Sequence, residues 1–92
     1  MHATLRWYSG NQDLADRLAA RGDEVRSVIG AISGVRAYYL VRTDGGTVSV
    51  TVADDASAAE QSNEVAAAWL RENMPDAASA PQVSTGDVLL SL

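Results

Sequence analysis

The stretch YYLVRTDGGTVSV, Tyr38–Val50, decides the fold of this 92-residue chain. Two runs rich in β-branched and aromatic residues flank Asp44-Gly45-Gly46, and Asp-Gly or Gly-Gly pairs are typical of two-residue hairpin turns. We therefore predict a β-hairpin whose strands are Val35–Val41 and Thr47–Ala53. A two-residue turn, at either Asp44-Gly45 or Gly45-Gly46, pairs odd with even positions and gives the hairpin two distinct faces.

A third strand is predicted at Ala3–Tyr8, where side chains alternate with the period of two that strands require. The valine face of the sheet would then carry Leu5, Trp7, Ala37, Tyr39, Val41, Val48, Val50 and Val52. The tyrosine–threonine face would carry Arg6, Tyr8, Tyr38, Leu40, Thr47, Ser49 and Thr51, with Leu89 added from a last strand.

Two helices are predicted from apolar residues at helical spacing. The first is indicated by Leu14, Leu18, Val25, Ile29 and Ile32, with a kink or break at Gly22. The second follows ASAAEQSNEVAAAWLREN, with Asp54 or Asp55 as its cap. One stripe of this second helix holds Ala58, Ser62, Val65 and Trp69.

The last strand is predicted at Val83–Leu92, where Val88, Leu90 and Leu92 alternate and Gly86 indicates a bulge. The element order is then β-α-β-β-α-β, which is typical of the ferredoxin-like α+β sandwich with both helices on one face of an antiparallel sheet. We expect one such domain over residues 1–92, with the valine face against the helices.

The tyrosine–threonine face would then lie open, although it holds two tyrosines and two leucines. An exposed patch of this kind usually indicates an interaction surface. A second copy packed around a two-fold axis would cover it, so we predict a homodimer that closes into an α+β barrel. Its mixed lining suits an interior that holds a small apolar ligand. The alternative is a solid interface without a cavity.

Composition excludes several classes of function. The formal net charge is −5, and the seven arginines are not clustered, so neither nucleic acid nor a membrane surface is an expected partner. The chain has no cysteine and one histidine, His2 at the N-terminal end, so we expect no metal site and no cofactor. No signal peptide or membrane-length apolar run is visible, which predicts a cytoplasmic protein. Arginine without lysine, with abundant alanine, indicates a GC-rich bacterial origin.

The run ISGVRAYYLVRTDGGTVSVTVADDASAAEQSNEVAAAWLREN resembles the dimeric α+β-barrel superfamily that includes the antibiotic biosynthesis monooxygenases. The similarity is greatest to small bacterial members with a PGF-x-x-Y segment before the hairpin and a helix rich in S-N…A-A-x-W. The ending QVSTGDVLL is also similar to theirs. Ser33 and Val35 depart from the pattern, because Pro and Phe are usual at these positions.

The resemblance implies a dimer of ferredoxin-like subunits with a pocket between each sheet and its helices. Some members oxygenate polycyclic aromatic compounds without metal or flavin, and others degrade haem or have no known activity. Oxygenation in the family relies on pocket Asn, Trp, Arg and Tyr residues. The matching candidates here are Asn63, Trp69, Arg6, Tyr8 and Tyr38, to which Thr51 is added as a ligand-binding candidate on the tyrosine–threonine face.

Asn63 and Trp69 are six residues apart on one helix, so their side chains should point about 120° away from each other. This spacing departs from oxygenating members and counts against a shared pocket. Two hypotheses follow. The first is a dimeric barrel that binds an aromatic or apolar metabolite, with oxygenation left open. The second is a structural homodimer whose interior is filled with side chains.

Overall fold

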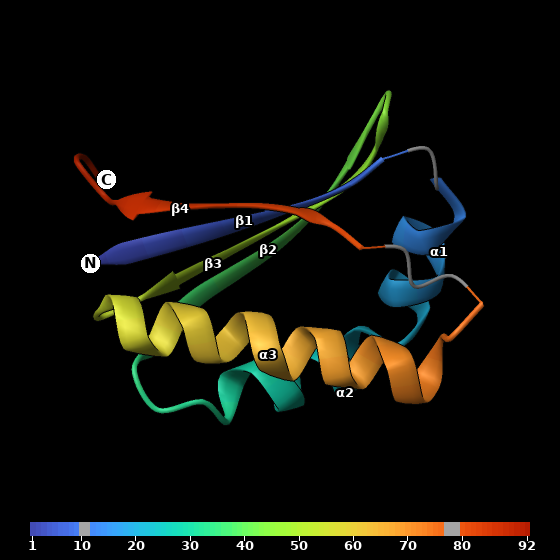
Figure 1. Ribbon diagram of the computed structural model, residues 1–92, viewed down its shortest axis with the longest axis horizontal. Helices are drawn as coiled ribbons and strands as arrows, with labels where there is room; N and C mark the ends of the chain where they lie inside the picture. Colours follow the sequence, from blue (N-terminus) through green and yellow to red (C-terminus); the bar gives the residue numbers. More distant parts are fainter. Residues whose placement is uncertain (10–11, 77–79) are drawn as a thin grey trace.

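The computed structural model describes residues 1–9, 12–76 and 80–92. The elements are β1 (His2–Ser9), α1 (Gln12–Ala20), α2 (Gly22–Gly30), β2 (Val35–Thr43), β3 (Gly46–Ala53), α3 (Ala56–Asn73) and β4 (Gln82–Asp87). The strands form one antiparallel sheet in the order β2-β3-β1-β4. All three helices lie on the same side of this sheet, below it in Figure 1. The ferredoxin-like α+β fold predicted from the sequence is therefore confirmed.

The central hairpin has the predicted register. Tyr39 pairs with Val50 and Val41 with Val48, so the valine face is assembled as expected. Thr43 pairs with Gly46, which makes Asp44-Gly45 the two-residue turn. The positive φ that such turns favour falls just after that pair, on Gly46 at 149°.

The helices cover the tyrosine–threonine face, so the prediction that they would pack on the valine face is wrong. Thr51 and Arg6 are 0% and 2% exposed, and Tyr8 lies in the main apolar core. On the valine face, Trp7 and Tyr39 remain 43% and 59% exposed. The tyrosine–threonine face is thus covered by the helices of the same chain.

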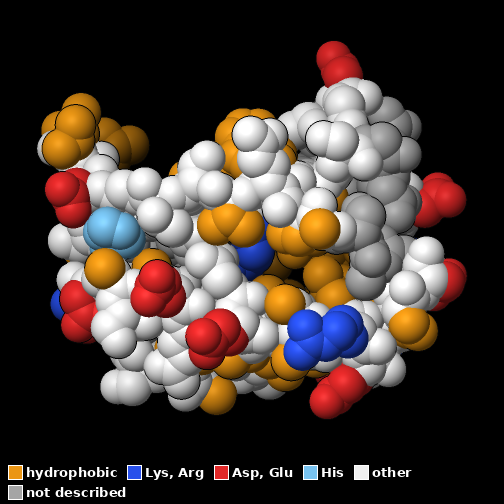
Figure 2. Space-filling view, viewed as in Figure 1, with side chains coloured by type: hydrophobic (Ala, Val, Ile, Leu, Met, Phe, Trp, Pro, Cys, Tyr) orange, Lys and Arg blue, Asp and Glu red, His pale blue; other side chains and the backbone are white. Residues whose placement is uncertain are grey.

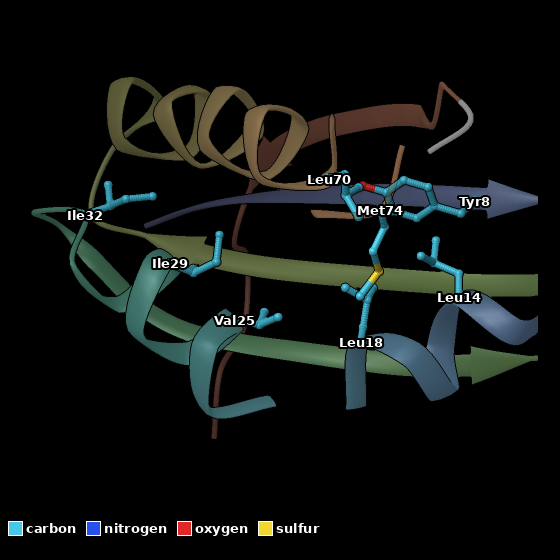
Figure 3. Close-up of a cluster of buried hydrophobic side chains, with 8 residues drawn as sticks. All are labelled: Tyr8, Leu14, Leu18, Val25, Ile29, Ile32, Leu70 and Met74. Carbon is cyan, nitrogen blue, oxygen red and sulfur yellow. The ribbon is translucent and has the colours of Figure 1, made fainter. Parts of the chain in front are cut away.

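The core lies between this face and the helices. In Figure 3, Tyr8 projects from β1 toward Leu70 of α3 and toward Met74, which directly follows this helix, with Leu14 and Leu18 of α1 beside them. Val25, Ile29 and Ile32 continue the cluster. All five apolar residues that predicted the first helical segment are therefore buried.

The polar residues of the sheet are buried because α3 offers them hydrogen-bond partners. Ser62 was predicted to lie on the buried stripe of this helix, and it is 0% exposed. Together with Asn63, it supplies the side-chain oxygens that contact Arg6. A buried polar group requires such a partner. Here the partners lie on α3, which covers the tyrosine–threonine face.

Three local features refine the predictions. The first helical segment is broken into α1 and α2, with Arg21 in a non-helical conformation before Gly22. Asp55 caps α3, as one of the two predicted alternatives, because its side chain accepts a hydrogen bond from the Ala58 backbone N–H. The pairing of β1 with β4 is continuous through Gly86, so the bulge expected there is absent.

The last strand is shorter than predicted, since β4 ends at Asp87 rather than Leu92. After Asp87, the Val88 N–H still donates a hydrogen bond to the Met1 carbonyl. No described strand pairs with the residues that follow Val88. Leu89 is consequently 93% exposed and does not belong to the tyrosine–threonine face.

Candidate functional site

The centre of the candidate site is a buried arginine. Alternation along β1 turns Arg6 toward the helices, where it is 2% exposed. Its Nη1 donates to the Asn63 Oδ1 at 2.7 Å and to the Ser62 Oγ at 3.4 Å, and its Nη2 donates to the Thr51 Oγ1 at 3.2 Å. Its Nε is also buried, but it has no hydrogen-bond partner among the described residues. The guanidinium therefore contacts neutral oxygens.

Neighbouring polar side chains hold these acceptors in place. The Thr4 Oγ1 donates to the same Asn63 Oδ1 at 3.1 Å, which fixes the amide between two residues of β1. The Ser62 hydroxyl donates to the Ala59 carbonyl one turn earlier in α3, at 2.6 Å, so its oxygen is free to accept from Arg6. The network links β1, β3 and α3 across the layer between sheet and helices.

Two tyrosines lie against this arginine. Burial raises the pKa of Tyr8 above its ordinary value of 10.0, and the positive charge of Arg6 offsets part of that effect. The pKa of Tyr38 is raised in the same way by burial, again with Arg6 acting in the opposite direction. Both phenols are therefore neutral at pH 7, and neither supplies a negative charge to balance the guanidinium.

A small cavity lies between the sheet and the helices, with a volume of about 30 Å³. Its walls include Tyr8, Tyr38, Ser49 and Trp69, together with Arg6. This space holds about two water molecules. The Trp69 ring that borders it is half-buried and is capped by the Arg21 guanidinium carbon, 4.9 Å from the ring centre.

A larger cavity of about 410 Å³ lies beyond Arg6. Figure 2 shows the hollow between β4 and α3, with basic side-chain atoms visible between apolar ones. Its lining combines apolar residues with three polar ones. The residues that line it include Arg6, Asn63, Ala67, Leu70, Arg71 and Val83. Sites for small molecules typically enclose about 300–1,000 Å³, so this volume suits a ligand of modest size.

The six residues proposed from the sequence come together, but under the helices rather than on an open face. Arg6 and Tyr8 border both cavities, whereas Tyr38 and Trp69 border the smaller one and Asn63 the larger one. Thr51 acts through its hydrogen bond to Arg6. Asn63 and Trp69 were expected to point in different directions from the helix, and they border different cavities.

Sequence reasoning missed Thr4, Ser62 and Arg71 as members of the site. Helical spacing could have found the last of these, because Asn63, Ala67 and Arg71 are successive positions four residues apart on one side of α3. Ser62 was recognised as a buried helix position, but a buried hydroxyl was not used as an indication that a polar group faces it.

The described part of the chain contains no group of three or more His, Asp or Glu side chains arranged to hold a metal ion. None of its described helices is both long and apolar enough to cross a membrane.

Comparison with solved structures places the architecture among known folds. An arginine-to-serine variant of MhuD, solved with two manganese protoporphyrin IX molecules per active site, matches all of this chain and 98% of its own, with a TM-score of 0.73 and 14% identity. The NE2512 protein of unknown function from Nitrosomonas europaea covers 99% of this chain and 90% of its own, with a TM-score of 0.69 and 19% identity. No family model and no curated protein sequence matches the chain. At these identities the likeness concerns architecture, and it agrees with the resemblance stated from the sequence: the chain has the α+β fold of these two proteins.

Proposed function

We propose that this protein binds a small aromatic or otherwise apolar metabolite in the larger cavity, between the sheet and α3. The observation that carries the proposal is a cavity of about 410 Å³ bounded by Leu70, Ala67 and Val83, with the buried Arg6 network in its wall. Apolar walls with a few oriented polar groups are the usual composition of small-molecule sites. The alternative of a filled interior predicts no such volume.

We further propose that the protein acts as a homodimer, through the valine face instead of the tyrosine–threonine face. Trp7 of β1 is 43% exposed on the uncovered side of the sheet, and Tyr39 and Val41 of β2 are 59% and 44% exposed; β3 lies between these two strands. Contiguous apolar surface of this kind is typical of interfaces. A two-fold axis would place the same face of a second copy against it and close the barrel.

The ligand we propose is smaller than a porphyrin. MhuD was solved with porphyrins in its active site, but the likeness to this chain extends to the fold alone. The described residues that line the two cavities include neither histidine nor cysteine, the common axial ligands of haem iron. His2 lies at the start of β1, where its Nδ1 is 3.3 Å from the Asp87 carboxylate.

Cofactor-independent oxygenation is the second candidate function, favoured by one feature. Arg6, itself buried and flanked by two neutral tyrosines, can stabilise an anionic intermediate. The described residues that line the two cavities include no carboxylate or imidazole that could remove a proton. Substrates for such a reaction would therefore be phenols that ionise near neutral pH by themselves. Oxygen uptake with such phenols tests this candidate.

The binding proposal is tested by filling the larger cavity. Ala67→Phe places a ring in the space that Ala67 borders, and Gln61→Phe places the same ring on an exposed position two turns away on α3. Calorimetric titration with naphthalene derivatives should show saturable binding of one ligand per protomer in the wild type and in Gln61→Phe. Binding should be lost in Ala67→Phe. No saturable binding by the wild type, or equal binding by both variants, would refute the proposal.

A further inference from the structure

The arginines of this chain divide into two groups. Of the seven, five have a carboxylate within ion-pair distance, and the pairs are Arg17–Asp76, Arg21–Glu24, Arg26–Asp23, Arg36–Asp54 and Arg42–Asp16. The remaining two, Arg6 and Arg71, appear in no ion pair among the described residues. Both line the larger cavity.

The charge of Arg6 is the more costly of the two to leave unbalanced. An ion removed from water loses favourable solvation free energy, which neutral acceptors restore in part. Its described partners are the amide of Asn63 and the hydroxyls of Ser62 and Thr51, and no described residue accepts a hydrogen bond from its buried Nε. A protein with a formal net charge of −5 thus has a locally cationic cavity wall.

The guanidinium also has a suitable geometry for a planar anion. Nε and Nη2 lie along one edge of the guanidinium group and can donate to both oxygens of one carboxylate. Within the described part of the chain Nε has no hydrogen-bond partner, and the hydrogen bond described for Nη2 is the one to Thr51 at 3.2 Å. Nη1, in contrast, is occupied by Asn63 and Ser62.

Building on the proposed binding function, we propose that the ligand of the larger cavity carries a carboxylate that pairs with Arg6. Its apolar body lies along Leu70, Ala67 and Val83. Arg71, which is exposed at the same cavity, attracts the anion from solution. Because Nε is buried, the head group reaches it after a small shift of the surrounding side chains.

Three matched ligands test the charge of the head group: naphthalene-2-carboxylate, naphthalene-2-carboxamide and 2-naphthyl phosphate. We expect the carboxylate to bind at least about tenfold more tightly than the amide, because charge-assisted hydrogen bonds are the stronger ones. Equal affinities would overturn this inference alone. Tighter binding of the phosphate than of the carboxylate would overturn the assignment of the head group. Absence of binding by all three would overturn the proposed function as well.

Variants then assign the preference to its residue. Arg6→Met removes the charge and keeps much of the side-chain volume, and it should bring the carboxylate-to-amide ratio close to one. Arg6→Lys keeps the charge without the planar fork and should give an intermediate ratio, which serves if the methionine variant does not fold. Arg26→Gln, which removes an exposed paired arginine away from the larger cavity, should leave the ratio unchanged. A ratio that survives in both Arg6 variants would refute the role of Arg6.

The contribution of Arg71 is distinguished by salt. Because this side chain is exposed, Arg71→Gln should weaken binding of the carboxylate a few-fold at low ionic strength and have little effect at high ionic strength. The loss caused by Arg6→Met should persist in high salt, since a buried pair is screened much less. A salt-independent loss in Arg71→Gln would contradict its place at the cavity mouth.

Discussion

Replacement of Trp7 by lysine should dissociate the proposed homodimer. Trp7 is 43% exposed on the valine face. It pairs with Val48 of β3, which in turn pairs with Val41 of β2. A fully covered aromatic side chain buries about 150–250 Å². The uncovered part of Trp7 therefore amounts to roughly 90 Å² that a partner subunit would bury.

The expected effect follows from this area. At about 25 cal/mol per Å², each copy of Trp7 contributes roughly 2 kcal/mol to association. A two-fold interface contains two copies, so the substitution removes about 4 kcal/mol, which corresponds to an increase of nearly a thousandfold in the dimer Kd. The two introduced ammonium groups would add repulsion to this loss.

Sedimentation velocity at micromolar concentration measures the effect directly. The wild type should sediment at twice the 9.7 kDa of the chain, and Trp7→Lys should sediment as the monomer. Ala31→Lys adds the same charge at an exposed position after α2, on the helical layer, and should remain dimeric. Far-ultraviolet circular dichroism should show that both variants are folded.

Fluorescence offers an independent measurement. In a Trp69→Phe background, Trp7 is the one remaining tryptophan, because the chain contains two. Its emission should shift to longer wavelength on dilution, as the dimer dissociates and the indole is exposed. A wild type that sediments as a monomer at micromolar concentration, or a Trp7→Lys variant that stays dimeric, would refute the reasoning.

Three further predictions concern stability. Asp55→Ala removes the cap of α3 and should lower the free energy of unfolding in urea by about 1 kcal/mol; an equal loss in Asp54→Ala, which breaks an exposed ion pair, would contradict this. Gly34→Ala should lower the melting temperature, because φ is 94° and the new Cβ would lie 3.1 Å from the Ala58 Cβ, whereas Gly30→Ala meets nothing within 4 Å and should not. Above pH 10 the free energy of unfolding should fall as pH rises, because burial holds the protons of Tyr8 and Tyr38 in the folded state while the unfolded phenols release theirs. Tyr38→Phe should flatten this decline in urea titrations between pH 8 and 11, and an unchanged slope would contradict the assignment.

The architecture could be predicted because each element has a local cause. The Asp44-Gly45 turn sets the parity of the hairpin, and the register of Tyr39 with Val50 follows from it. The spacing of the apolar residues from Leu14 to Ile32 defines the helical face, and the break between α1 and α2 lies at Gly22, where a kink or break was predicted.

The choice of the covered face could not be predicted from alternation alone. Alternation divides a sheet into two faces but does not state which one meets the helices, and hydrophobicity indicated the wrong one. Arg6, Thr51 and Ser49 are buried beneath the helices, and Arg6 reaches partners more than forty residues away along the chain. On the more apolar face, Trp7 and Tyr39 stay exposed.

The candidate residues lie near one another in the structure, but beneath the helices instead of on an open face. Arg6 and Tyr8 of β1 and Tyr38 of β2 lie on the same face of the sheet because side chains alternate along each strand. This relation holds whichever layer covers that face. Arg71 was missed because its helical spacing from Asn63 was not used as an indication of a shared site. That it forms no ion pair with a described residue becomes evident from the tertiary arrangement.

The hydrogen bonds from β1 to Asn63 have a consequence for how α3 is aligned. This helix is rich in alanine and presents a smooth surface, over which small displacements along its axis would change the apolar contact area little. Thr4 and Arg6 both donate to the same amide oxygen, and this requirement admits a single axial position of the helix. We expect Asn63→Leu to keep most of the helix content but to broaden the nuclear magnetic resonance signals of α3, because several sliding positions would then be close in energy.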